Sequence, residues 1–129
     1  MKKVKIGSIE FFACAGVIIW AIVLFLRTKN ISNSDFYLFV IGMLPNLAAA
    51  WISTLFGKWI IVFLMKRSIT IKIYRFLCLS IFLFAVCSEL IYDMFLGSSF
   101  DIYDILITAI AQIIIFIVPI RIKDKSLSE

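Results

Sequence analysis

The chain has no histidine, and only 16% of its 129 residues are charged. Without histidine, zinc and haem lose their usual protein ligand, and acid–base catalysis loses its most common side chain. A soluble globular domain carries about a quarter charged and about half apolar residues. A chain with 64% hydrophobic residues therefore falls outside that class and is expected to be an integral membrane protein.

The chain also has little of what an active site needs. Its three cysteines, Cys14, Cys78 and Cys87, all fall in apolar runs and are expected to pack in the core as small hydrophobes. No metal-ligand cluster, phosphate-binding loop or activated nucleophile accompanies the acidic residues. We therefore expect no enzyme activity, no catalytic residue, no bound metal and no cofactor.

Long apolar runs dominate what is present. A helix needs about 20 apolar residues to cross the hydrocarbon core, so 129 residues accommodate about four spans. The predicted fold is all-α, a polytopic bundle of four transmembrane helices forming one domain over residues 1–129. The predicted spans cover residues 9–26, 36–65, 74–96 and 102–120.

The second run is about ten residues longer than a span needs and contains Pro45. Proline removes a backbone donor and crowds the preceding turn, so a kink is predicted there. Gly42, Asn46 and Ala50 recur every four residues and make one small or polar stripe on this helix. Small residues let helices approach closely in lipid, which predicts that this helix lies at the centre of the bundle.

Lysine and arginine concentrate in three places, which predicts orientation because cytoplasmic loops are rich in these residues. We expect the N-terminus, the middle connection and the C-terminus in the cytoplasm. An uncleaved first helix is favoured over a signal peptide, because no small-residue cleavage site follows its apolar run. Lys58, near the cytoplasmic end of the second helix, is expected to extend to the interface. The cations that set the orientation are Lys2, Lys3, Lys5, Lys66, Arg67, Lys72, Arg75, Arg121, Lys123 and Lys125.

Four carboxylates, Glu89, Asp93, Asp101 and Asp104, lie within sixteen residues around the last turn, which the same rule places on the extracytoplasmic side. Glu89 and Asp93 are one helical turn apart, so their like charges require a nearby cation, protonation of one carboxyl or hydration of Asp93. Asp101 precedes the last helix and is expected to cap it. Cation binding, proton coupling and recognition of a cationic or polar group are the functions that such a cluster favours.

A polar stripe continues inward from this turn. Asp104, Thr108 and Gln112 recur every four residues on the last helix, and polar side chains inside a span normally face the bundle. We expect Glu89, Asn46, Thr108 and Gln112 to meet at similar depth. They would form either a ligand site or a satisfied interhelical hydrogen-bond network.

Residues 89–111, ELIYDMFLGSSFDIYDILITAIA, resemble the C-terminal half of VanZ-like proteins, with Glu89, Asp101 and Asp104 matching the family pattern. Three positions depart from that pattern: Tyr92 stands for glutamine, Thr108 for asparagine and Ala111 for glycine. VanZ-like proteins are small bacterial membrane proteins whose founding member is linked to teicoplanin resistance. The resemblance implies a cell-envelope role at the outer face of the bacterial cytoplasmic membrane, with an effect on glycopeptide susceptibility.

Two functions follow from these features. The first is a non-enzymatic envelope protein whose acidic extracytoplasmic site contacts an envelope component or a partner membrane protein. The second is a small transporter or ion-coupled protein that uses Glu89. It would be a homodimer, because four helices are few for alternating access. In both, membrane lipids are partners, and the net charge of +5 belongs to the cytoplasmic rim rather than to a nucleic-acid site.

Overall fold

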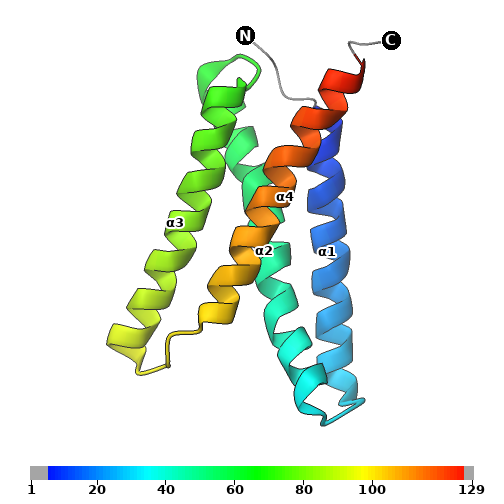
Figure 1. The fold of residues 1–129 in the computed structure, drawn as a ribbon, viewed down its shortest axis with the longest axis vertical. Helices are drawn as coiled ribbons and strands as arrows, with labels where there is room; N and C mark the ends of the chain where they lie inside the picture. The colour runs from blue at the N-terminus through cyan, green and yellow to red at the C-terminus, as the bar shows by residue number, and fades with distance from the viewer. Residues whose placement is uncertain (1–5, 127–129) are drawn as a thin grey trace.

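The computed structural model describes the backbone of residues 6–126 and the side chains of residues 8–118. Its elements confirm the all-α prediction. They are α1 (Ile6–Lys29), α2 (Asp35–Met65), α3 (Ile71–Leu96) and α4 (Ile102–Ser126), joined by three short connections (Figure 1). The α1–α2 and α3–α4 connections lie at one end of the molecule, and the α2–α3 connection lies at the other.

Three helices, α1, α2 and α3, are long and apolar enough to cross a membrane, and α4 contributes the shorter apolar segment Ile102–Val118. Large hydrophobic side chains cover the outside of the bundle, for example Phe63, which is 80% exposed, and Phe11 and Phe84. A soluble monomer rarely exposes apolar surface on this scale. The protein is therefore membrane-embedded, with lipid as the solvent of its outer surface.

Hydroxyl caps fix where two helices begin. Ser34 precedes α2, and its Oγ accepts a hydrogen bond from Tyr37 N at 3.3 Å. Thr70 caps α3 in the same way, through Ile73 N at 3.5 Å. That cap starts α3 three residues before the predicted position 74, because an apolar-run boundary carries no information about capping.

Helix α2 is central, as its small-residue stripe predicts. It contacts all three other helices, and it runs without interruption through Pro45. Two glycines permit its closest approaches. A Cβ on Gly16 of α1 would lie 3.1 Å from the Ala48 carbonyl oxygen, and a Cβ on Gly57 would lie 2.5 Å from Leu77 Cδ1 of α3. The predicted stripe is used only in part, since nothing lies within 4 Å of a Cβ on Gly42.

Side-chain donors tie the other helices to the backbone of α4. Trp51 Nε1 of α2 donates to the Ala111 carbonyl oxygen at 3.0 Å, and the Tyr74 hydroxyl of α3 donates to the carbonyl of Ile115. Both bonds use the second lone pair of a helical carbonyl. They fix α4 against α2 and α3 near the middle of the bundle.

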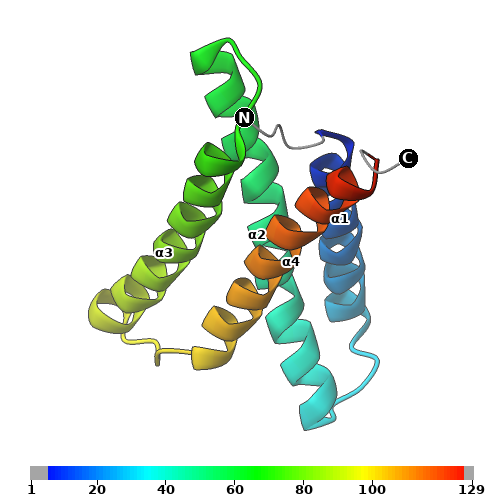
Figure 2. The same cartoon turned by 45° about the horizontal axis from the view of Figure 1, so that its top comes forward.

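At the end with two connections, the α1–α2 and α3–α4 connections lie well apart (Figure 2), and α4 crosses in front of α2. The cysteines are distributed differently from the prediction. Cys78 is buried, whereas Cys14 and Cys87 are exposed on the helix surface. These runs are apolar on every side, so the sequence did not indicate which face of each helix turns outward.

Candidate functional site

A small polar pocket lies between α2, α3 and α4, close to the α3–α4 connection. We call it the acidic pocket. It has a volume of about 30 Å³, and its lining combines two carboxylates with an amide and two hydroxyls. The polar residues that line it are Asn46 of α2, Ser88 and Glu89 of α3, and Asp104 and Thr108 of α4.

The hydroxyls of this pocket are committed as donors to their own helices. Ser88 Oγ donates to the Ala85 carbonyl oxygen, and Thr108 Oγ1 donates to the Asp104 carbonyl oxygen, each at 2.8 Å. Their oxygen lone pairs remain available as acceptors. With the carboxylates, they make the pocket rich in acceptors and suited to a cation, an N–H group or water.

The charge of the acidic pocket is not balanced by any cation among the described side chains. The Asp104 carboxylate is repelled by Glu89 and Asp101 and interacts favourably with the Asn46 side chain. Within the described part of the chain, no lysine or arginine forms an ion pair with any of the four carboxylates of the predicted cluster. A positive group entering the pocket would therefore relieve repulsion between carboxylates.

The volume limits what enters. A single water requires at least about 10–15 Å³ of such space, so 30 Å³ holds a water or a small cation and not a ring or a peptide. Among residues 8–118, no group of three or more His, Cys, Asp or Glu side chains is arranged to hold a metal ion. The acidic pocket thus fits the tip of a cationic group, a small ion or a proton-carrying water.

Two of the predicted site residues lie outside this pocket. Asp101 is exposed, and its Oδ1 accepts a hydrogen bond from Tyr103 N at 2.9 Å, which confirms the capping prediction. Asp93 is also exposed, one turn beyond Glu89. This exposure is what the hydration alternative requires for two like charges on one helix face.

Gln112 is also separate from the acidic pocket. It is 5% exposed, and its Nε2 donates to the Ala50 carbonyl oxygen and to Thr54 Oγ1, both at 3.2 Å. Thr54 Oγ1 in turn donates to the Ala50 carbonyl at 2.8 Å. Because Gln112 lies one turn beyond Thr108, it meets Thr54 rather than Asn46. Of the two predicted alternatives, an interhelical hydrogen-bond network rather than a ligand site describes the contacts of Gln112.

The prediction that Lys58 extends to the membrane interface is wrong. Lys58 is 3% exposed, and its Nζ forms an ion pair with Glu10 Oε1 of α1. The side chain turns into the bundle because Glu10 offers a counter-charge there, and a buried ammonium needs one. The other oxygen, Glu10 Oε2, is buried and accepts no hydrogen bond from any described residue.

Sequence reasoning missed this ion pair, although a signal existed. Glu10 and Lys58 are the isolated charges inside the first two apolar runs, and both lie near the same predicted membrane face. Charged residues within spans normally pair with one another. That rule identifies the two partners once both runs are taken as helices with opposite directions.

Polar groups follow one face of α2 along most of its length. Asn46, the Ala50 carbonyl, Thr54 and Lys58 recur every four residues, which places them in one row. We call this row, with Gln112 and Glu10, the polar row. The polar row extends from the acidic pocket to the ion pair. It is not a continuous network, because no hydrogen bond among described residues joins Thr108 to Gln112 or Thr54 to Lys58.

Together, these features define an all-α, membrane-embedded protein. At one end it has an acidic pocket that pairs with no described lysine or arginine, and toward the other it has a buried ion pair. Comparison with protein-family models, curated proteins and solved structures gave no match.

Proposed function

We propose that this chain is a non-enzymatic, VanZ-like envelope protein with four spans, whose acidic pocket receives a cationic group from the extracytoplasmic side of the bacterial membrane. The observation that carries the proposal is the pair Glu89 and Asp104, which share a half-buried pocket rich in acceptors and form no ion pair with a cation of residues 8–118. Such a site favours a positive ligand group. The size of the pocket restricts that group to an ammonium or something similarly small.

The apolar part of α4 supports the fourth span. Its segment Ile102–Val118 has 17 residues and extends about 25 Å, at the short end of the range for a transmembrane helix. An even number of spans puts both chain ends on one side, and the cations at the α2–α3 connection, Lys66 and Arg67, favour the cytoplasm for that side. The acidic pocket then opens outward, where an envelope component or a glycopeptide is accessible.

The test is antibiotic susceptibility in a bacterial host that lacks the protein. Expression of the parent chain should raise the inhibitory concentration of teicoplanin, and Glu89→Gln or Asp104→Asn should abolish that protection. Asp93→Asn, which removes an exposed carboxylate one turn away, is the matched control and should protect normally. Membrane levels of all four proteins are compared by immunoblot. Protection by both pocket variants at the parent level, or none by the parent, would refute the proposal.

The polar row favours a second function, that of an ion-coupled homodimer. Intramembrane polar residues mark proton and ion pathways, and the polar row lies between the acidic pocket with Glu89 and Asp104 and the ion pair of Lys58 with Glu10. Proteoliposomes containing a pH-sensitive dye measure this directly. A proton or cation flux that Glu89→Gln removes would support coupling, whereas liposomes as tight as protein-free ones would exclude it.

A further inference from the structure

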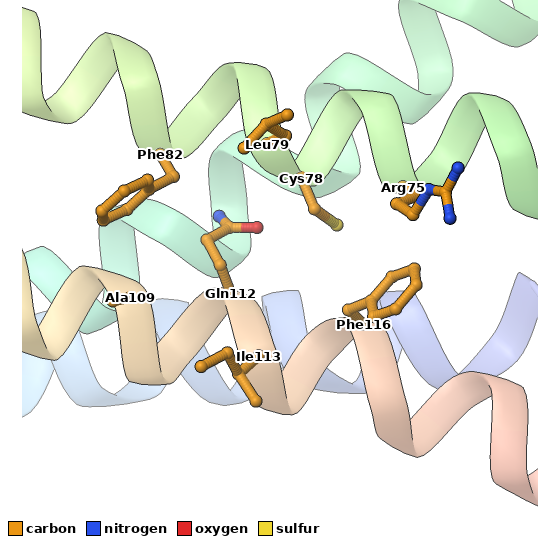
Figure 3. Close-up of a pocket in the computed structure, with 8 residues that line it drawn as sticks. All are labelled: Arg75, Cys78, Leu79, Phe82, Ala109, Gln112, Ile113 and Phe116. Atoms are coloured by element: carbon orange, nitrogen blue, oxygen red, sulfur yellow. The ribbon is translucent and has the colours of Figure 1, made fainter.

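The groove between α3 and α4 is separate from the acidic pocket and from the ion pair of Glu10 with Lys58. It has a volume of about 280 Å³, close to the lower limit of roughly 300 Å³ for small-molecule pockets. Its walls are apolar, with Leu79 and Phe82 on α3 and Ile113 and Phe116 on α4 (Figure 3). Gln112 reaches into it from α4, but the amide nitrogen is already bonded to Ala50 and Thr54. The groove therefore presents an apolar surface.

One end of this groove is cationic. Arg75 lines that end and also borders a second, larger hollow of about 730 Å³, where Lys72 lies one turn earlier on α3. Neither hollow has an aspartate or glutamate in its lining. Within the described residues, neither Arg75 nor Lys72 forms an ion pair or a hydrogen bond. Arg75 and Lys72, which pair with no described residue, therefore lie at one end of the apolar groove.

We propose that this groove binds an anionic phospholipid, with one acyl chain between α3 and α4 and the phosphate held by Arg75 and Lys72. Arg75 and Phe82 are seven residues apart, so the groove follows about 10 Å of α3, enough for part of a chain. Arg75 lies one turn inside the start of α3, near the level of the headgroups. Basic pockets between helices at a membrane face bind anionic headgroups, and the arginine fork suits phosphate.

Charge favours a lipid over a second copy of the chain as occupant. A two-fold dimer through this groove would bring Arg75 and Lys72 of one copy toward the same residues of the other. No carboxylate in either hollow would offset that repulsion. The site is separate from the acidic pocket, so it does not depend on the function proposed above.

The experiment is native mass spectrometry of the full chain in detergent, titrated with phosphatidylglycerol or phosphatidylcholine of the same acyl chains. We expect one phosphatidylglycerol to be retained in preference to phosphatidylcholine. Arg75→Gln should lower the affinity for phosphatidylglycerol about fivefold, the factor expected for one cation near the headgroup plane. Arg67→Gln removes a cation from the neighbouring connection and is the matched control. Ala109→Leu fills the groove and should weaken phosphatidylglycerol binding without removing a charge.

Four results would overturn the proposal. The first is equal binding of the two lipids, and the second is that Arg67→Gln lowers the affinity for phosphatidylglycerol as much as Arg75→Gln. Oleate would displace phosphatidylglycerol at equal concentration, which would assign the groove to a single-chain carboxylate. A lipid-independent dimer that Ala109→Leu dissociates would make the groove an interface between copies. Circular dichroism of each variant confirms that the helices are intact, and Arg75→Gln changes only an exposed side chain.

Discussion

At the residue scale, Lys58 and Glu10 form a contact in which each side chain compensates the other's charge inside the bundle. Removing one partner of a buried ion pair leaves an unpaired charge in a medium of low dielectric constant. Replacing both by apolar residues avoids that penalty. The pair is thus expected to behave very differently under single and double substitution.

Glu10→Gln should lower the free energy of unfolding by about 3 kcal/mol, the lower limit for a broken buried pair, since Glu10 is partly accessible. The double variant Glu10→Met/Lys58→Met should recover most of that loss. Thermal unfolding in detergent measures both, with Lys66→Gln as an exposed control. Equal destabilisation by the single and double variants would contradict the energetic role of the pair.

Gln112 is expected to contribute less to the free energy of unfolding than the ion pair of Glu10 with Lys58. Gln112→Leu removes the bonds to Thr54 and the Ala50 carbonyl, while Thr54 keeps its own bond to that carbonyl. Interhelical hydrogen bonds in membranes contribute about 0.6 kcal/mol on average and at most about 1.7. The expected loss lies in that range by the same unfolding measurement. A loss near that of Glu10→Gln would mean that the polar row is cooperative.

Among the elements, α2 packs closely against α1 at Gly16 and against α3 at Gly57. The two contacts differ in which atoms approach the glycine. A Cβ on Gly16 would press on a backbone carbonyl, Ala48 O, which cannot move by changing rotamer. A Cβ on Gly57 would meet the end of the flexible Leu77 side chain. The open space around Gly42 provides an internal reference.

Gly16→Ala should therefore destabilise the bundle by about 1–3 kcal/mol, as overpacking does. Gly57→Ala should be less harmful, because Leu77 can move aside, and Gly42→Ala should be neutral or slightly stabilising. Ranking the three midpoints of thermal unfolding tests this order. If Gly42→Ala were the most harmful of the three, the packing described for α2 would be incorrect.

The elements were more predictable from the sequence than their contacts. Hydropathy gave helix ends close to those observed, and short-range chemistry gave the cap at Asp101. The Lys58–Glu10 and Gln112–Thr54 contacts depend on how each helix is rotated about its axis. Runs that are apolar on every side leave that rotation undefined. For the same reason, Gln112 was expected beside Glu89 in the candidate site.

At the scale of the whole molecule, the asymmetric distribution of charge predicts the orientation in the membrane, and cysteine labelling tests that prediction. In a background where the three cysteines are replaced by serine, Ser99→Cys lies in the α3–α4 connection and Ser68→Cys in the α2–α3 connection. A membrane-impermeant maleimide added to intact cells should label Ser99→Cys alone. Lysed cells should label both variants. Labelling of Ser68→Cys in intact cells would reverse the orientation and place the acidic pocket in the cytoplasm.

The ion pair between Glu10 and Lys58 also bears on how the chain enters the bilayer. An isolated charge inside a span opposes insertion, by at most about 2.5–3.5 kcal/mol when it lies at the centre. Because α1 and α2 are consecutive, the first helical hairpin holds both charges before α3 and α4 are synthesised. The hairpin can therefore leave the translocon with its charges already neutralised, and a ribosome-bound intermediate should be membrane-integrated once Lys58 has emerged.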